Sequence, residues 1–124
     1  MKKSYGIVVI GGGPAGLAAA IKAYDSGEKN VLIIERDDKL GGILNQCIHN
    51  GFGLTRFKES LTGPEYAYRF ILEAKKRDIE ILTGTTVLSL SANNENNAGN
   101  KITAINPKDG VFTVFAKAVI LAMG

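Results

Sequence analysis

The sequence predicts an α/β fold in three layers: a parallel sheet of about four strands, helices on one face and a small antiparallel β-meander on the other. Three observations lead to this prediction. Short apolar runs suited to buried strands alternate with helical patterns in the first part of the chain. A glycine-rich turn joins the first apolar run to the first helical pattern. Three β-prone runs separated by polar turns precede a last apolar run.

Length and composition predict one ordinary globular domain over residues 1–124. Apolar residues make up 45% of the chain and charged residues 22%, with a formal net charge of +3. Basic residues are interleaved with acidic ones, so we expect no nucleic-acid partner. No apolar run approaches the length of a membrane span. The single cysteine, Cys47, fits a cytoplasmic location, and we expect no metal site.

The first third of the chain predicts a βαβ unit. Residues 4–10 are almost wholly apolar and read as a parallel strand buried on both faces. A helix over residues 14–26 follows, because Pro14 is tolerated in a first turn and Gly27 is placed to end the helix. Residues 31–35 form a second buried strand, which we expect beside the first and parallel to it.

The middle of the chain predicts a long loop and a second helix. Residues 36–61 have little periodicity, and we expect an extended loop with one short helix, of the kind that is usually functional. Thr62 and Glu65 have the spacing of a capping box, and Tyr66 and Phe70 belong to the apolar face of a helix that ends at about Arg77.

The last third predicts strands. A short strand over residues 79–82 is followed by the runs 85–92, 101–106 and 111–116, which we expect to form the meander. Residues 117–124 read as a further buried strand that ends in glycine.

The pattern Gly11-x-Gly13-x-x-Gly16 follows a predicted strand and opens a predicted helix, which is the context of a dinucleotide-binding turn. Gly11 permits the tight turn, Gly13 lets the backbone meet a pyrophosphate, and Gly16 lets helix and strand pack closely. The helix start at Pro14 and Ala15 adds amide groups and the helix dipole, which stabilise phosphate charge.

Glu35 at the end of the second strand predicts recognition of a ribose. Its carboxylate can accept hydrogen bonds from ribose hydroxyls, and its charge repels a 2′-phosphate, which argues against NADP at this site. The neighbouring Arg36 softens that repulsion. The βαβ unit alone does not separate FAD from NAD, because both share the adenosine diphosphate half.

A family resemblance favours FAD. The segments "VVIGGGPAGLAAA", "IIER" and "LGG" resemble the FAD domain of the two-dinucleotide-binding flavoproteins, the pyridine nucleotide-disulfide oxidoreductase superfamily. The end "KAVILAMG" resembles that superfamily's second fingerprint, with Met123 in place of a threonine. The resemblance implies that Gly41, Gly42 and Gly124 approach the cofactor. More narrowly, residues 40–70 are similar to bacterial FAD-dependent oxidoreductases related to the anaerobic glycerol-3-phosphate dehydrogenase flavoprotein subunit.

The departures from that superfamily also matter. Its disulfide reductases carry two redox cysteines, whereas this chain has only Cys47, so a dithiol relay in this segment is excluded. The resemblance places Cys47 and His49 near the flavin ring as catalytic candidates; the alternative is a buried thiol and a backbone-bonded histidine. The superfamily continues into an NAD(P)H-binding part, so we expect the chain to be the N-terminal FAD-binding part of a larger flavoprotein.

The resemblance implies an FAD-dependent oxidoreductase that passes a hydride or electron pair between NAD(P)H, or a small substrate, and the flavin. Two alternatives stay open: an inactive nucleotide-binding module and the Rossmann domain of an NAD-dependent dehydrogenase. The expected partners are FAD, with NAD(P)H as co-substrate of the longer protein, and a remaining domain or subunit. Apolar surface left uncovered without that part predicts self-association into homo-oligomers.

Overall fold

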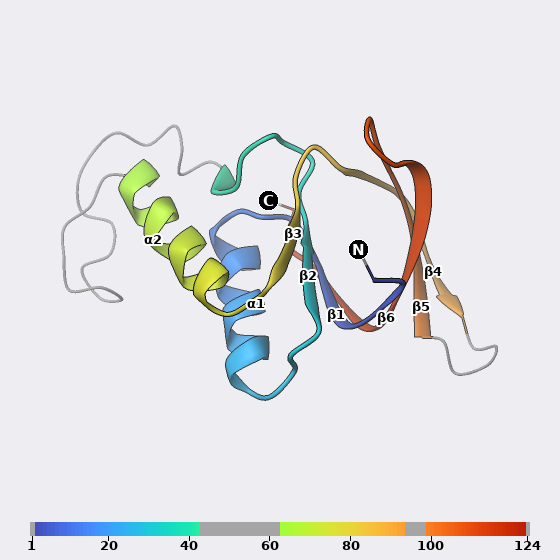
Figure 1. Cartoon of the computed structure of the whole chain (residues 1–124), viewed down its shortest axis with the longest axis horizontal. Coiled ribbons are helices and arrows are strands. Elements are labelled where there is room, and N and C mark those ends of the chain that lie inside the picture. The colour runs from blue at the N-terminus through green and yellow to red at the C-terminus, as the bar shows by residue number, and fades with distance from the viewer. Residues whose placement is uncertain (1, 43–62, 94–98, 124) are drawn as a thin grey trace.

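The computed structural model describes residues 2–42, 63–93 and 99–123 (Figure 1). Two helices and six strands make up this part of the chain. In chain order they are β1 (Ser4–Ile10), α1 (Pro14–Asp25), β2 (Val31–Ile34), α2 (Gly63–Lys76), β3 (Glu80–Leu82), β4 (Thr86–Asn93), β5 (Gly99–Asn106) and β6 (Gly110–Leu121). The predicted elements are therefore present, with shifts of one or two residues at several ends. Most of the predicted loop over residues 36–61 lies outside the described residues.

The described strands form one six-stranded sheet in the order β3-β2-β1-β6-β5-β4. The strands β3, β2, β1 and β6 are parallel neighbours, and β6, β5 and β4 are antiparallel neighbours. Val9 at the centre of the sheet lies between Ile33 of β2 and Ile120 of β6. The predicted parallel sheet and antiparallel meander are both confirmed.

The structure corrects the predicted end of the meander. The third meander run and the last buried strand were expected to be separate, but they are the two halves of β6. The first half pairs with β5, from Asn106↔Gly110 to Asn100↔Ala116, and the second half pairs with β1 up to Leu121. Residues 111–121 contain no glycine, proline, asparagine or aspartate, so the strand changes partner without a break.

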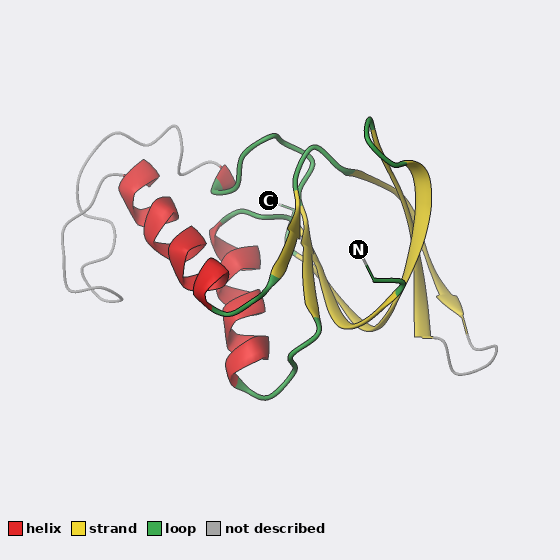
Figure 2. Cartoon of the chain, in the orientation of Figure 1, coloured by secondary structure: helices red, strands yellow, loops and turns green. Residues whose placement is uncertain are grey.

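Each face of the parallel sheet is covered by its own hydrophobic core. Both helices lie on one side of the sheet (Figure 2), and Leu17 of α1 and Phe70 of α2 pack there against Val9. The meander covers the other side, where Ile102 packs with Val8 and its neighbours in a second cluster. Alternate residues of β1 thus enter opposite cores, and the predicted three layers are confirmed.

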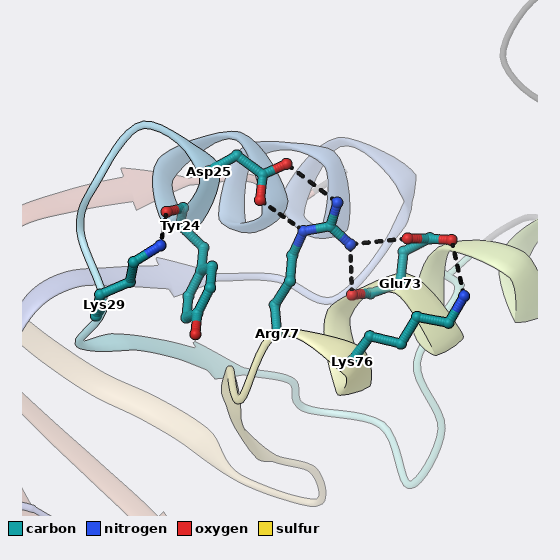
Figure 3. Close-up of polar contacts among 6 residues, drawn as sticks. All are labelled: Tyr24, Asp25, Lys29, Glu73, Lys76 and Arg77. Atoms are coloured by element: carbon teal, nitrogen blue, oxygen red, sulfur yellow. Dashed lines mark hydrogen bonds and ion pairs between the residues drawn. The ribbon is translucent and has the colours of Figure 1, made fainter.

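The C-terminal ends of the two helices are joined by Arg77 (Figure 3). Its guanidinium donates to both carboxylate oxygens of Asp25, at 2.7 and 3.1 Å, and to the carboxylate and carbonyl oxygens of Glu73, both at 2.8 Å. The bond from Arg77 lowers the pKa of Glu73 from its ordinary value. Neither helix in the described part of the chain is long and apolar enough to cross a membrane.

Candidate dinucleotide-binding site

The glycine-rich turn lies where strand β1 ends and helix α1 begins. Gly11 has a φ of 116°, a conformation that side chains rarely permit, and its amide donates to the carbonyl oxygen of Ile34 at 2.8 Å. The first helical hydrogen bond runs from the amide of Leu17 to the carbonyl oxygen of Gly13 at 2.9 Å. The turn therefore opens at the carboxyl end of the parallel strands, where open α/β sheets bind ligands.

Two glycines of the fingerprint are required by the chain itself. A Cβ atom at Gly16 would overlap the carbonyl oxygen of Gly11, and a Cβ atom at Gly11 would overlap that of Ala122. These contacts are backbone contacts, so no side-chain rotation could relieve them. The predicted roles of Gly11 in a tight turn and of Gly16 in close packing both agree with this geometry.

Gly13 is different, because the described structure does not demand a glycine there. Its φ of −77° and ψ of −171° are available to any residue. A Cβ atom at Gly13 would have the Cα of Gly42, at 3.9 Å, as its nearest neighbour outside the adjoining residues, which is an ordinary contact. Neither the backbone conformation of Gly13 nor a contact with another described residue therefore requires a glycine at this position.

The start of α1 leaves hydrogen-bond donors available beside Gly13. Pro14 has no amide hydrogen, and Gly13 as N-cap provides no side-chain acceptor. Within the described residues, the amides of Ala15 and Gly16 have no acceptor. Free amides at a helix N-terminus, together with the helix dipole, make this turn suited to an anionic group.

The carboxylate of Glu35 is held at the edge of the same turn. One oxygen accepts the amide of Gly12 at 2.7 Å, and the other accepts the amide of Asp37 at 2.8 Å. A carboxylate has about four acceptor positions, so two remain for further donors such as hydroxyl groups. Because two backbone amides fix its position, Glu35 presents a negative charge that cannot easily swing away.

A hollow of about 270 Å³ opens beside Glu35, at the carboxyl ends of β1 and β2. Main-chain and side-chain atoms from four parts of the chain surround it. The lining residues are Ile10, Gly11, Ile34, Glu35, Arg36, Thr85, Thr86, Val87 and Met123. Arg36 is exposed at this rim and has no hydrogen-bond or ion-pair partner among the described residues. The combination of an apolar floor, a fixed acid and a free cation suits a polar ring system with attached hydroxyls.

The Leu40-Gly41-Gly42 segment packs onto the glycine turn. The amide of Gly41 donates to the carbonyl oxygen of Gly12 at 2.7 Å. Gly42 has a φ of 56°, and a Cβ atom there would lie 3.2 Å from the Cα of Gly13. Leu40 is buried in the helix-side core. The close approach of this segment is thus to the backbone of the turn, and its approach to a cofactor stays a prediction.

The structure brings most of the predicted site residues to one edge of the sheet. They are Gly11, Gly13, Pro14, Ala15, Gly16, Glu35, Arg36, Gly41 and Gly42. Cys47, His49 and Gly124 lie outside the described residues.

Sequence reasoning did not single out Thr85, Thr86, Val87 and Met123, which line the hollow. A usable signal was present, because residues 83–87 follow the third parallel strand, and carboxyl ends of parallel strands meet at one edge of a sheet.

Comparisons with known proteins indicate the class of protein that this chain resembles. The model of a family described as FAD dependent oxidoreductase matches residues 6–63, just under half of the chain. A thioredoxin reductase from Ureaplasma parvum is 39% identical over 79 residues, which is 63% of this chain and 24% of that protein. These matches support an FAD-binding oxidoreductase domain.

Solved structures extend the likeness over nearly the whole chain. Bacillithiol disulfide reductase from Bacillus cereus superposes with a TM-score of 0.79, at 16% identity, over 98% of this chain and 40% of that one. An atypical thioredoxin reductase from Desulfovibrio vulgaris gives a TM-score of 0.71, at 26% identity, over 97% of this chain and 36% of that one.

The fold is the FAD/NAD(P)-binding Rossmann-like fold. The chain spans about a quarter or less of the curated relatives that it matches.

Proposed function

We propose that the chain is the N-terminal FAD-binding domain, over residues 1–124, of a larger FAD-dependent oxidoreductase. The observation that supports this most directly is Gly13. Gly11 and Gly16 have backbone neighbours that exclude a side chain, whereas a Cβ atom at Gly13 would meet the described residues only in an ordinary contact, beside free helix amides. A pyrophosphate lying against Gly13 accounts for both the missing side chain and the unpaired donors.

The described residues then divide the cofactor between them. The amides of Ala15 and Gly16 hold the pyrophosphate, and the remaining acceptor positions of Glu35 receive the ribose hydroxyls. The hollow bounded by Thr85, Val87 and Met123 accommodates the adenine. Gly41 and Gly42 would approach the cofactor, and Cys47 and His49 are candidates for contact with the flavin ring.

When bound, FAD would supply the redox chemistry, by exchange of a hydride or electron pair with NAD(P)H or a small substrate. This chain would bind the cofactor, orient it and set the charge around its adenosine half. The longer protein would provide the remaining domain or subunit and the second nucleotide site. The finer likeness to the relatives of the anaerobic glycerol-3-phosphate dehydrogenase flavoprotein subunit, and the cytoplasmic location, are part of the same proposal.

An absorbance spectrum of the purified chain in the near-ultraviolet and visible range, followed by calorimetric titration with FAD, ADP and NAD, tests the proposal. We expect saturable binding of FAD and ADP. Glu35→Gln should weaken the binding of FAD and of ADP by about tenfold to a hundredfold, because the ribose hydroxyls would then donate to a neutral amide instead of a charged carboxylate. Asp38→Asn is the matched control, since Asp38 is an exposed acid on the same loop.

Two results would contradict the proposal in different ways. Tight NAD binding without FAD binding would favour the dehydrogenase alternative. Binding of FAD that is equally strong in the Glu35→Gln and Asp38→Asn variants would place the cofactor elsewhere on the molecule.

A further inference from the structure

The side chain of Asn106, at the end of β5, connects the β5–β6 turn to the wall of the hollow. Its Nδ2 donates to Thr85 Oγ1 at 3.2 Å and to Asp109 Oδ2 at 3.2 Å. Its Oδ1 accepts the backbone amide of Asp109 at 2.6 Å. Because an amide N–H can only donate, the bond from Asp109 fixes which end of the Asn106 amide faces Thr85.

Thr85 is the residue through which this connection reaches the hollow. It is 1% exposed and lines the hollow together with Thr86 and Val87. Its hydroxyl donates to the carbonyl oxygen of Thr83 at 2.9 Å, and its amide donates to the carbonyl oxygen of Glu35 at 3.0 Å. Thr85 is thus bonded to the end of β2 on one side and to Asn106 on the other.

The pairing of β4 with β5 explains why a side chain is needed here. The ladder begins at Thr86↔Ile105, and its register shifts between Val87 and Ser89. Thr86 and Val87 therefore form a short paired stretch between the end of the ladder and a register shift, and Thr85 lies one position beyond the ladder. Thr85 and Asn106 are the next two residues beyond the last ladder pair, and the side-chain bond from Asn106 links them where the backbone ladder has ended.

From this arrangement we infer that Asn106 is a positioning residue of the nucleotide site. Through Thr85 it holds residues 85–87 at their place opposite Glu35, so that the affinity for an adenosine nucleotide depends on the β5–β6 turn. The inference rests on the proposed function, because it assigns the hollow to the adenosine half of the cofactor.

The test compares two asparagines of the same strand in the 124-residue chain. Asn106→Asp keeps an acceptor for the Asp109 amide but removes both Nδ2 bonds. Asn100→Asp is the control, since the Asn100 amide donates to the carbonyl oxygens of Ala116 and Lys117, at 3.4 and 3.3 Å, at the other end of β5. ADP is the titrant, and amide hydrogen exchange of Thr86 and Val87 is measured in parallel.

We expect Asn106→Asp and Thr85→Val each to weaken ADP binding by about threefold to tenfold, because both variants lose the hydrogen bond between Asn106 and Thr85. The double variant should weaken ADP binding by less than the product of the two single effects, because the two variants share the loss of the Asn106–Thr85 bond. Thr85→Ser, which retains the hydroxyl, should bind ADP like the parent chain. Exchange of Thr86 and Val87 should accelerate in Asn106→Asp and stay unchanged in Asn100→Asp.

Unchanged ADP affinity in Asn106→Asp, or equal losses in Asn106→Asp and Asn100→Asp, would overturn the inference. If the parent chain binds neither ADP nor FAD, the proposed function fails, and hydrogen exchange then decides the positioning role on its own. In that case, unchanged exchange of Thr86 and Val87 in Asn106→Asp would show that Asn106 does not hold the wall.

Discussion

The first turn of α1 packs so closely on the turn that follows strand β1 that a Cβ atom at Gly16 would overlap the carbonyl oxygen of Gly11. Gly13, between them in sequence, has no such contact. The glycine fingerprint therefore contains two kinds of glycine: Gly11 and Gly16, which backbone contacts require, and Gly13, for which we propose a bound pyrophosphate as the reason. Substitution of the two kinds of glycine should therefore have different effects on the free energy of unfolding and on nucleotide affinity.

Gly16→Ala should lower the free energy of unfolding by about 1–3 kcal/mol or more, because the helix must move off the strand to admit a methyl group. Gly13→Ala should cost less than about 1 kcal/mol, since its backbone conformation suits alanine. Urea denaturation of both variants, with FAD titration of Gly13→Ala, measures this contrast. Gly13→Ala that binds FAD as tightly as the parent chain would contradict a pyrophosphate at this position.

Removing Arg77 should uncouple the ends of the two helices. Its fork-shaped contact with Asp25 is partly shielded, with exposed side-chain fractions of 23% for Arg77 and 49% for Asp25. A double-mutant cycle with Arg77→Ala and Asp25→Ala should give a coupling energy of about 0.5–1 kcal/mol. Lys76→Ala is the control, because Lys76 is 70% exposed and lies 3.4 Å from Glu73. A coupling energy near zero would show that Arg77 acts through Glu73 alone.

The hydroxyl of Tyr5 should contribute to stability in a pH-dependent way. Tyr5 is 4% exposed, and its hydroxyl donates to Glu80 at 2.8 Å. Burial, and then the bond to Glu80, raise the pKa of Tyr5 above its ordinary value near 10. A raised pKa means that the folded state favours the neutral hydroxyl, so this contribution is complete below pH 10 and is lost as the pH rises further.

Tyr5→Phe should therefore lower the free energy of unfolding by about 1 kcal/mol at neutral pH. It should also make the loss of stability above pH 10 less steep, as measured by urea denaturation at stepped pH. Tyr68→Phe, at a 59% exposed tyrosine, should change neither quantity. Equal alkaline behaviour of Tyr5→Phe and the parent chain would exclude this role for the hydroxyl.

Asp78 should tolerate glycine but not a β-branched residue. It has a φ of 60° and connects the end of α2 to β3. Asp78→Ile should lower the free energy of unfolding by about 1–2 kcal/mol, because a branched side chain clashes with its own backbone in this conformation. Asp78→Gly should retain the parent stability in thermal unfolding. Similar losses in both variants would indicate that the Asp78 side chain, and not its backbone, matters.

Much of the candidate site could be predicted because its signals are local. The strand before Gly11, the helix after Pro14 and the acid at Glu35 follow from apolar runs, turn chemistry and the short reach of a βαβ unit. The capping spacing and the apolar face with Phe70 likewise predicted α2. These features depend on residues within a few turns of one another, where propensity and periodicity carry most of the information.

Long-range pairing determined the rest. The strand β6 is continuous because its first half pairs with β5 and its second half with β1. No turn-forming residue within residues 111–121 marks the point at which the partner changes. Thr85 and Met123 are distant from the glycine turn in sequence, and they line the hollow because β1, β2, β3 and β6 end at the same edge of the sheet. Asn106 reaches this wall only through its hydrogen bond to Thr85. Contacts of this kind arise from the packing of whole elements, so no short stretch of residues encodes them.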